Sequence, residues 1–204
     1  MDHILRKFLT HGPPPRRRPG HEYDALSWRP GSAISCAMTL DAVLSLLAFL
    51  IACAAAATPG IAFRPGAWYR GLAKPSWCPP DWLFGPVWTV LYVSVAVAGW
   101  LVWQRAGLGG AALALAVYAV QLVLNGLWST LFFGLRRPDL ALAEIVCLWL
   151  SVLATIATFH PVDATAAWIL VPYAAWVSFA VILNLSIWRL NPARASSSGR
   201  GRRR

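Results

Sequence analysis

Residues 68–88 read WYRGLAKPSWCPPDWLFGPVW, and this stretch decides the class of fold. It holds four of the twelve tryptophans and four of the fifteen prolines, and it leads into an uncharged hydrophobic run. Tryptophan is enriched where a membrane meets water. Proline fixes φ and is poorly tolerated inside helices, so much of the stretch is predicted to be a stiff loop. We therefore expect a rigid aromatic loop at the mouth of a membrane-embedded bundle.

The composition of the whole chain also indicates a membrane protein. It is 58% hydrophobic and 13% charged, whereas soluble proteins carry about 25% charged residues. Five stretches are long and apolar enough to cross a hydrocarbon core of about 30 Å. They are residues 38–57, 82–103, 111–134, 140–159 and 164–188. The prediction is an all-α membrane protein, a bundle of five transmembrane helices with a long Trp- and Pro-rich loop (residues 58–80) between the first two. Asp81, Asp139 and Asp163 each precede an apolar run and are predicted helix N-caps.

The predicted membrane domain covers residues 38–191 and is flanked by two basic tails. Residues 1–37 are rich in Pro and Arg without an apolar period, and residues 192–204 end in GRGRRR. Both tails are predicted to be disordered. Met38 opens the first span and is an alternative start of translation. The basic C-terminal tail is expected to attract anionic lipid headgroups, and no nucleic-acid-binding motif accompanies it.

The placement of Lys and Arg predicts an orientation. The N-terminal side carries 7 of them, and the side holding residues 58–80 and the C-terminus carries 11. Because cytoplasmic segments carry an excess of Lys and Arg, the C-terminus is predicted to be cytoplasmic. If the chain is counted from Met38, the N-terminal side carries 1 Lys or Arg and the C-terminal side carries 11, which strengthens the prediction.

Several kinds of chemistry are disfavoured. The four histidines lie outside the predicted spans, which argues against an intramembrane haem ligand or a histidine-rich metal site. The four cysteines are scattered and predict no disulfide. There is no Gly-rich phosphate loop, zinc-protease motif or nucleophile elbow. We expect no metal site and no required cofactor.

Three spans carry aromatic stripes at helical spacing. The stripes are Trp88 and Tyr92; Tyr118, Gln121, Asn125, Trp128 and Phe132; and Tyr173, Trp176, Ala180 and Leu183. Amides facing lipid are costly, so the middle stripe should point inward. Its two amides either join helices by hydrogen bonds or orient a ligand in an aromatic cavity, and the flanking aromatic rings favour the cavity. Glu144, the acid deepest in a span, has an open role, with Arg136 or Arg137 as a possible partner.

Three long segments resemble the translocator protein family, also called the TspO or tryptophan-rich sensory protein family. They are WYRGLAKPSWCPPDWLFGPVWTVLY (68–92), YAVQLVLNGLWSTLFF (118–133) and VPYAAWVSFAVILNLSIWRLN (171–191). The resemblance implies a five-helix membrane bundle, commonly a homodimer, that binds protoporphyrin and haem. The matching pocket positions are Trp77, Trp88, Tyr92, Gln121, Asn125, Trp128, Trp176, Phe179, Ala180 and Leu183.

Two positions depart from the family pattern. Leu185 stands where the sterol-recognition motif of animal members has a tyrosine, so sterol binding is not expected. Cys78 precedes Pro79, a dipeptide resembling haem-responsive motifs, and its thiolate is a candidate haem ligand. A neutral substitution at a variable loop position is the favoured interpretation of Cys78.

The leading hypothesis is a membrane protein that binds tetrapyrroles and regulates or handles porphyrins in tetrapyrrole metabolism, with porphyrin or haem as ligand. One alternative is light- and oxygen-dependent porphyrin degradation with Trp88 and Trp176 as electron donors, an activity that the resemblance implies for some bacterial members. A second alternative is transport of porphyrin or lipid, although the spans show no inverted repeat.

Overall fold

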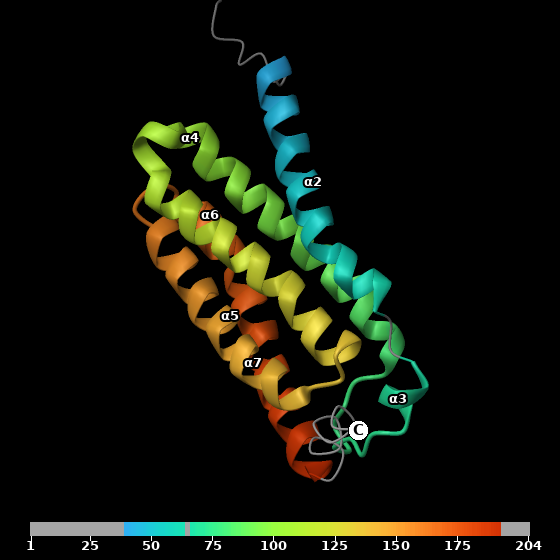
Figure 1. Ribbon diagram of the computed structural model, residues 1–204. Coiled ribbons are helices and arrows are strands. Elements are labelled where there is room, and N and C mark those ends of the chain that lie inside the picture. The colour runs from blue at the N-terminus through green and yellow to red at the C-terminus, as the bar shows by residue number, and fades with distance from the viewer. Residues whose placement is uncertain (1–38, 64–65, 193–204) are drawn as a thin grey trace, which may run out of the picture. The chain divides into compact units, whose positions relative to one another are not determined.

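The structure is a computed structural model that describes residues 39–63 and 66–192. Of the two predicted tails only Pro192 is among these residues, and the proposed alternative start, Met38, also lies outside them. The described chain is helical and contains no strand. Its elements are α2 (Leu40–Ala62), α3 (Ala67–Arg70), α4 (Asp81–Ser129), the π-helix η1 (Thr130–Gly134), α5 (Pro138–Phe159), α6 (Ala164–Ile169) and α7 (Val171–Leu190). Helix α2 packs against α4, α4 against α5, and α5 against α7, as Figure 1 shows.

Among the described residues, four helical segments are long and apolar enough to cross a membrane, by length and composition. They are Leu40–Ala62, Asp81–Gly134, Pro138–Phe159 and Ala164–Leu190. The segment Asp81–Gly134 covers two of the predicted spans, so the number five stays a prediction. At 1.5 Å per residue a straight helix of 54 residues would measure about 80 Å, far more than a hydrocarbon core of about 30 Å.

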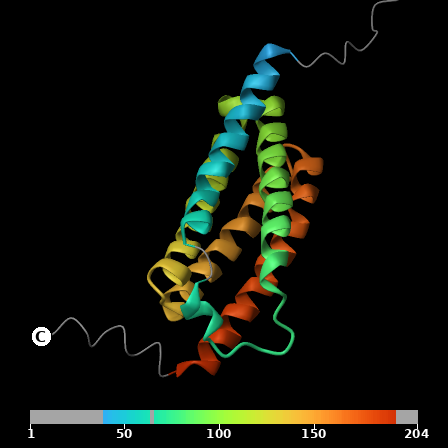
Figure 2. The ribbon, with the colours of Figure 1, turned by 90° about the vertical axis from the view of Figure 1, so that its right-hand side faces the viewer.

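Helix α4 does not run straight, because its backbone breaks at two residues. Gly107 has φ 54° and ψ −162°, and Ala111 has φ −131° and ψ 23°, both outside the helical region. The chain reverses direction there, so residues 81–106 and residues 112–129 of α4 lie side by side (Figures 1 and 2). Glycine adopts the positive φ at little cost, which is why the reversal occurs at Gly107. We call this end of the bundle the reversal end and the opposite end the loop end.

Helix α2 is longer than predicted and passes through Pro59 to Ala62. Proline cannot donate a hydrogen bond to the carbonyl four residues earlier, which here belongs to Ala55. The hydroxyl of Thr58 donates to that carbonyl instead, at 2.6 Å. The Phe63 N–H then closes the last turn on the Pro59 carbonyl at 2.8 Å. The connection to α4 is therefore shorter than the predicted 58–80, and it contains the short helix α3.

The three predicted N-caps have different outcomes. Asp163 caps α6, because its carboxylate accepts from the Ala166 N–H at 3.0 Å. Asp81 and Asp139 lie just inside their helices, in the first turn. The N-caps are Pro80 and Arg137, and neither has a side-chain capping hydrogen bond.

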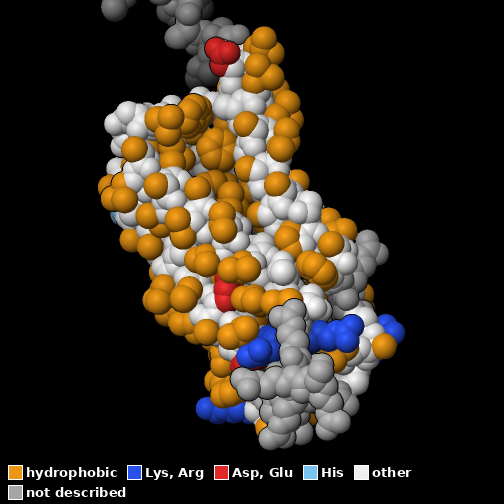
Figure 3. Space-filling view, in the orientation of Figure 1, with side chains coloured by type: hydrophobic (Ala, Val, Ile, Leu, Met, Phe, Trp, Pro, Cys, Tyr) orange, Lys and Arg blue, Asp and Glu red, His pale blue; other side chains and the backbone are white. Residues whose placement is uncertain are grey.

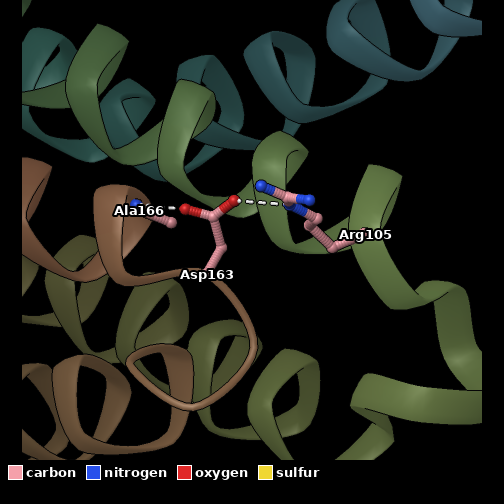
Figure 4. Close-up of polar contacts among 3 residues, drawn as sticks. All are labelled: Arg105, Asp163 and Ala166. Atoms are coloured by element: carbon pink, nitrogen blue, oxygen red, sulfur yellow. Dashed lines mark hydrogen bonds and ion pairs between the residues drawn. The ribbon is translucent and has the colours of Figure 1, made fainter.

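At the reversal end, the Asp163 carboxylate also accepts from Arg105 Nε at 3.1 Å (Figure 4). Asp163 thus ties the end of the first half of α4 to the start of α6. These hydrogen bonds hold the pKa of Asp163 below its ordinary value, mainly through the Ala166 N–H and further through the Arg105 guanidinium.

The outer surface of the bundle suits a lipid environment. Leu113 and Val123 are each 71% exposed, and in α2 the one buried residue is Cys53. Figure 3 shows hydrophobic side chains over most of one face, with Lys and Arg gathered at the loop end. The described cations of the loop end are Arg70, Lys74, Arg136, Arg137 and Arg189.

Candidate ligand-binding cavity

A cavity of about 380 Å³ lies toward the loop end of the bundle. Its volume falls within the range of roughly 300–1,000 Å³ that is usual for small-molecule sites. Side chains from α2, α3, both halves of α4, η1 and α7 line it. Seven of the residues proposed from sequence are among them: Trp88, Tyr92, Asn125, Trp128, Trp176, Ala180 and Leu183.

Three of the proposed residues do not line this cavity. Gln121 is 1% exposed and is buried between helices instead. Phe179 packs against Trp176, with ring centroids 5.4 Å apart, and Trp77 packs edge-on against Phe179 at 5.7 Å. Trp77 and Phe179 therefore support the cavity wall from behind. The family resemblance proposed both residues as pocket positions, and the structure places them one layer behind the wall.

The cavity walls are largely aromatic. Trp88 lies 5.5 Å from Tyr92, and Phe84 meets Trp176 edge-on at 6.0 Å. Trp128 stacks on Phe132 at 5.3 Å with an interplanar angle of 24°. Phe132 belongs to η1, whose wider π turn shifts the register of the side chains after α4; such turns recur at functional sites. The result is a hydrophobic enclosure of flat surfaces suited to a flat ligand.

A chain of hydrogen bonds connects the amides at the end of the cavity nearer the reversal. The Tyr92 hydroxyl donates to Asn125 Oδ1 at 2.6 Å, and Asn125 Nδ2 donates to the Tyr173 hydroxyl at 2.6 Å. The Tyr173 hydroxyl donates in turn to Gln121 Oε1 at 3.1 Å. Gln121 thus joins helices, which is the alternative role proposed for these amides. Asn125 does so too, and it also lines the cavity.

Asn184 is a cavity residue that the sequence analysis missed. It is 2% exposed, and neither Oδ1 nor Nδ2 has a hydrogen-bond partner among the described residues. The indole Nε1 of Trp128 is also buried without a partner there. The signal was available, because Asn184 lies four residues after Ala180 and continues the stripe of α7 as a lone amide in an apolar helix.

Glu144 is buried, and neither of its carboxylate oxygens has a hydrogen-bond partner in the described chain. Arg137 does not reach it, because Arg137 donates to the two oxygens of Asp139 at 2.9 and 2.7 Å. That pairing raises the pKa of Arg137. No ion pair joins Arg136 to Glu144 either, so the proposed partners of Glu144 are not found in the described residues.

The connection before α4 is held against the end of α7. The Asn191 side chain exchanges two hydrogen bonds with the Ala73 backbone, at 3.0 and 2.9 Å. The Lys74 ammonium lies 3.9 Å from both Asp81 Oδ1 and the ring centre of Tyr69. Tyr69 lines the cavity, and burial, with Cys78 and Asp81 nearby, raises its pKa. This connection therefore forms part of the cavity wall.

Cys78, the candidate haem ligand, does not line the cavity. Its thiol lies 3.6 Å from the Pro79 carbonyl. Within the described residues no three His, Cys, Asp or Glu side chains gather as a metal site. Cys78 lies behind the cavity wall, next to the lining residue Tyr69.

A helical membrane protein with a buried aromatic cavity is the class that this fold and site define. Residues 42–189 match the model of the TspO/MBR family, and the chain belongs to that family. Protein CrtK of Rhodobacter capsulatus is 45% identical over 148 residues, which is 71% of this chain and 91% of that protein. The tryptophan-rich sensory protein of Cereibacter sphaeroides is 44% identical over 154 residues, 76% of this chain and 95% of the relative. The human translocator protein is 41% identical over 128 residues, 61% of this chain and 75% of the relative.

Proposed function

We propose that this protein binds tetrapyrroles, protoporphyrin and haem, in the aromatic cavity and has a regulatory or porphyrin-handling role in tetrapyrrole metabolism. The observation that carries the proposal is the convergence of Trp88, Trp128 and Trp176 on one apolar cavity. Flat aromatic walls gain affinity by stacking and by burying an apolar ring. Family membership supports the proposal, although the names of the relatives do not specify a ligand.

The cavity wall offers contacts to the ring rather than to a metal. No histidine or cysteine is among its lining residues. Metal-free protoporphyrin is therefore expected to bind at least as tightly as haem. The carboxylates of the ligand would lie near Lys74, the cation beside the cavity residue Asp81. Trp77, Gln121 and Phe179 would act through the residues they hold in place.

The test is a titration of the purified protein with protoporphyrin in the dark, followed by tryptophan fluorescence. Saturable quenching that weakens in Trp176→Phe and Trp88→Phe would support the cavity. Trp168→Phe is the matched control, because Trp168 is 68% exposed and does not line the cavity. Equal weakening in all three variants, or quenching that never saturates in the unaltered protein, would contradict the proposal.

The second candidate function is light-driven degradation of the bound porphyrin, with dioxygen as the oxidant. The observation that favours it is that Trp88 and Trp176, the proposed electron donors, both line the cavity. Illumination of the aerobic complex should then give a new product spectrum. Trp88→Phe should bind porphyrin yet form product more slowly. If the spectrum of the bound porphyrin does not change on illumination in air, the degradation hypothesis is rejected and binding remains the proposed function.

We further propose a multi-pass arrangement with five spans, a cytoplasmic C-terminus and a homodimeric assembly. Five of the six described Lys and Arg residues belong to the loop end, which supports a cytoplasmic location of that end. Labelling of single cysteines placed at Arg189 and at Arg105, from either side of sealed vesicles, would test the orientation. Cross-linking in the native membrane would test the dimer.

A further inference from the structure

The wall of the cavity is incomplete between α2 and the first half of α4. Gly60 and Ile61, at the end of α2, line the cavity and are also exposed residues. Gly85 and Thr89, near the start of α4, also both line the cavity and are exposed. Residues that face both an interior cavity and the exterior form the rim of an opening. We call this opening, bounded by Gly60, Ile61, Gly85 and Thr89, the side opening.

The same pair of helices is closed nearer the reversal end. A Cβ atom added to Gly99 would lie 2.8 Å from Tyr118 and 2.9 Å from Phe49, so the helices meet there without a gap. The Tyr92 hydroxyl still reaches the Ala56 carbonyl, at 3.5 Å. Farther along, a Cβ atom on Gly85 would meet nothing within 4 Å. The two helices therefore separate toward the loop end, and the side opening lies where they part.

The side opening is surrounded by exposed apolar side chains and by an exposed tryptophan, as expected at the boundary between the lipid tails and the headgroups. Ile61 is 60% exposed and Val90 is 65% exposed, which suits contact with lipid tails. Trp82, in the first turn of α4, is 70% exposed, and tryptophan is enriched at the membrane interface. The Lys74 and Asp81 pair lies at the start of the same helix. The opening thus joins the hydrocarbon region at its boundary with the headgroups.

We propose that ligands enter and leave the cavity sideways, from the bilayer, through the side opening. This inference rests on the proposed ligand binding and specifies the source of the ligand. The chemistry fits a flat, largely apolar acid that partitions into lipid with its charged edge at headgroup depth. Its ring would pass between α2 and α4, and its carboxylates would stay near Lys74.

The test places a bulky side chain on the rim and measures exchange rates in lipid nanodiscs loaded with protoporphyrin. Thr89→Phe and Ile61→Trp narrow the opening from its two sides. Both should slow association and dissociation by about tenfold or more, with a smaller change in Kd, because a blocked passage raises the barrier in both directions. Thr158→Phe is the matched control, since Thr158 makes the same kind of hydrogen bond to a carbonyl four residues earlier and does not line the cavity.

Unchanged rates in both rim variants would overturn the side opening. So would faster dissociation with unchanged association, because that result means the new side chain displaces ligand instead of blocking its path. If the unaltered protein shows no saturable binding at all, the proposed function fails. A second measurement, which needs no bound porphyrin, then tests whether the side opening exists.

That second measurement uses a thiol inside the cavity. Leu183→Cys, in a chain whose native cysteines are replaced, puts a single thiol on the cavity wall, where Leu183 is 6% exposed. The side opening predicts that a lipid-soluble maleimide reacts faster than a sulfonated, membrane-impermeant one, and that Thr89→Phe slows the lipid-soluble reagent. Equal rates for the two reagents, unaffected by Thr89→Phe, would refute the opening.

Discussion

The two ends of the bundle use the same kinds of side chain in opposite ways. At the reversal end, Tyr118 stacks on Phe159 with ring centroids 5.8 Å apart and meets Phe49 edge-on, also at 5.8 Å. Its hydroxyl donates to the Val95 carbonyl at 3.2 Å, so the ring is buried and its polar atom is paired. At the loop end, equally large rings enclose a cavity of about 380 Å³, and the buried Nε1 of Trp128 has no partner within the described chain.

The difference comes from the residues between the rings. Ala96, Ala98 and Gly99 bring the helices close enough at the reversal end for Phe49 and Tyr118 to fill the space. Toward the loop end, Trp88, Trp128 and Trp176 line the cavity, and each packs against a different ring, Tyr92, Phe132 and Phe84 respectively. Hydrophobicity therefore does not distinguish a packed core from a cavity in this bundle. What distinguishes the two ends is whether neighbouring rings fill the space between the helices.

The largest expected effect comes from filling the closed end. Gly99→Val places methyl groups where even a Cβ would lie 2.8 Å from Tyr118, so overpacking should lower the free energy of unfolding by about 1–3 kcal/mol. Gly109→Val is the control, because a Cβ at Gly109 meets nothing within 4 Å. Unfolding in mixed detergent micelles gives both values. Equal stability of the two variants would mean that the closed end tolerates added volume.

The next effect tests the boundary between the two ends. Asn125→Leu removes the partner of both the Tyr92 and Tyr173 hydroxyls, and about 1–2 kcal/mol of stability should be lost. Asn184→Leu should lose no stability and should gain some, since the Asn184 amide is buried without a partner in the described residues. Comparable losses in the same unfolding assay would show that Asn184 is paired in the membrane.

Glu144 allows a test in the opposite direction. A buried carboxyl group without a partner lowers stability, so Glu144→Leu should raise the free energy of unfolding by about 1 kcal/mol. Glu144→Gln keeps a polar group at the same place and should gain less. If both variants are less stable than the unaltered protein, then Glu144 has a hydrogen-bond partner in the membrane, such as a water molecule or a ligand.

A comparable effect, with a pH signature, is expected at the reversal end. Asp163→Ala removes the cap of α6 and should cost about 1 kcal/mol. Because the pKa of Asp163 is lower in the folded protein, its contribution is present above the ordinary Asp pKa of about 4 and is lost as the pH falls through the folded-state pKa. The difference between the two proteins should therefore shrink below about pH 4.

Arg105→Met should have the smallest effect, about 0.5 kcal/mol or less, because the Arg105 side chain is 71% exposed. The same unfolding assay measures it at low and high salt. If Arg105→Met loses as much unfolding free energy as Asp163→Ala, then Asp163 stabilises the fold through its ion pair with Arg105 and not through the helix cap.

Much of this architecture follows from patterns that a sequence displays. Apolar length predicts the membrane helices, and steps of three and four predict that Trp88, Asn125 and Trp176 face inward. The end of α2 could not be predicted, because the helix continues only where the Thr58 hydroxyl replaces the donor that Pro59 lacks. The sequence left Gln121 with two roles, joining helices or lining a cavity, and only the structure shows that it joins helices. Periodicity gives the face of a helix that a residue occupies, but not how close the neighbouring helix lies.

The reversal at Gly107 also has a consequence for how the chain is made. The two apolar halves of α4 are joined by a connection of a few residues, since the helical backbone breaks only at Gly107 and Ala111. They are therefore expected to leave the translocation machinery together as one hairpin. Ribosome-bound chains of increasing length would reveal this as a single insertion step for both halves. A substitution such as Gly107→Val, which disfavours the positive φ at this position, would then reduce the amount of protein inserted into the membrane.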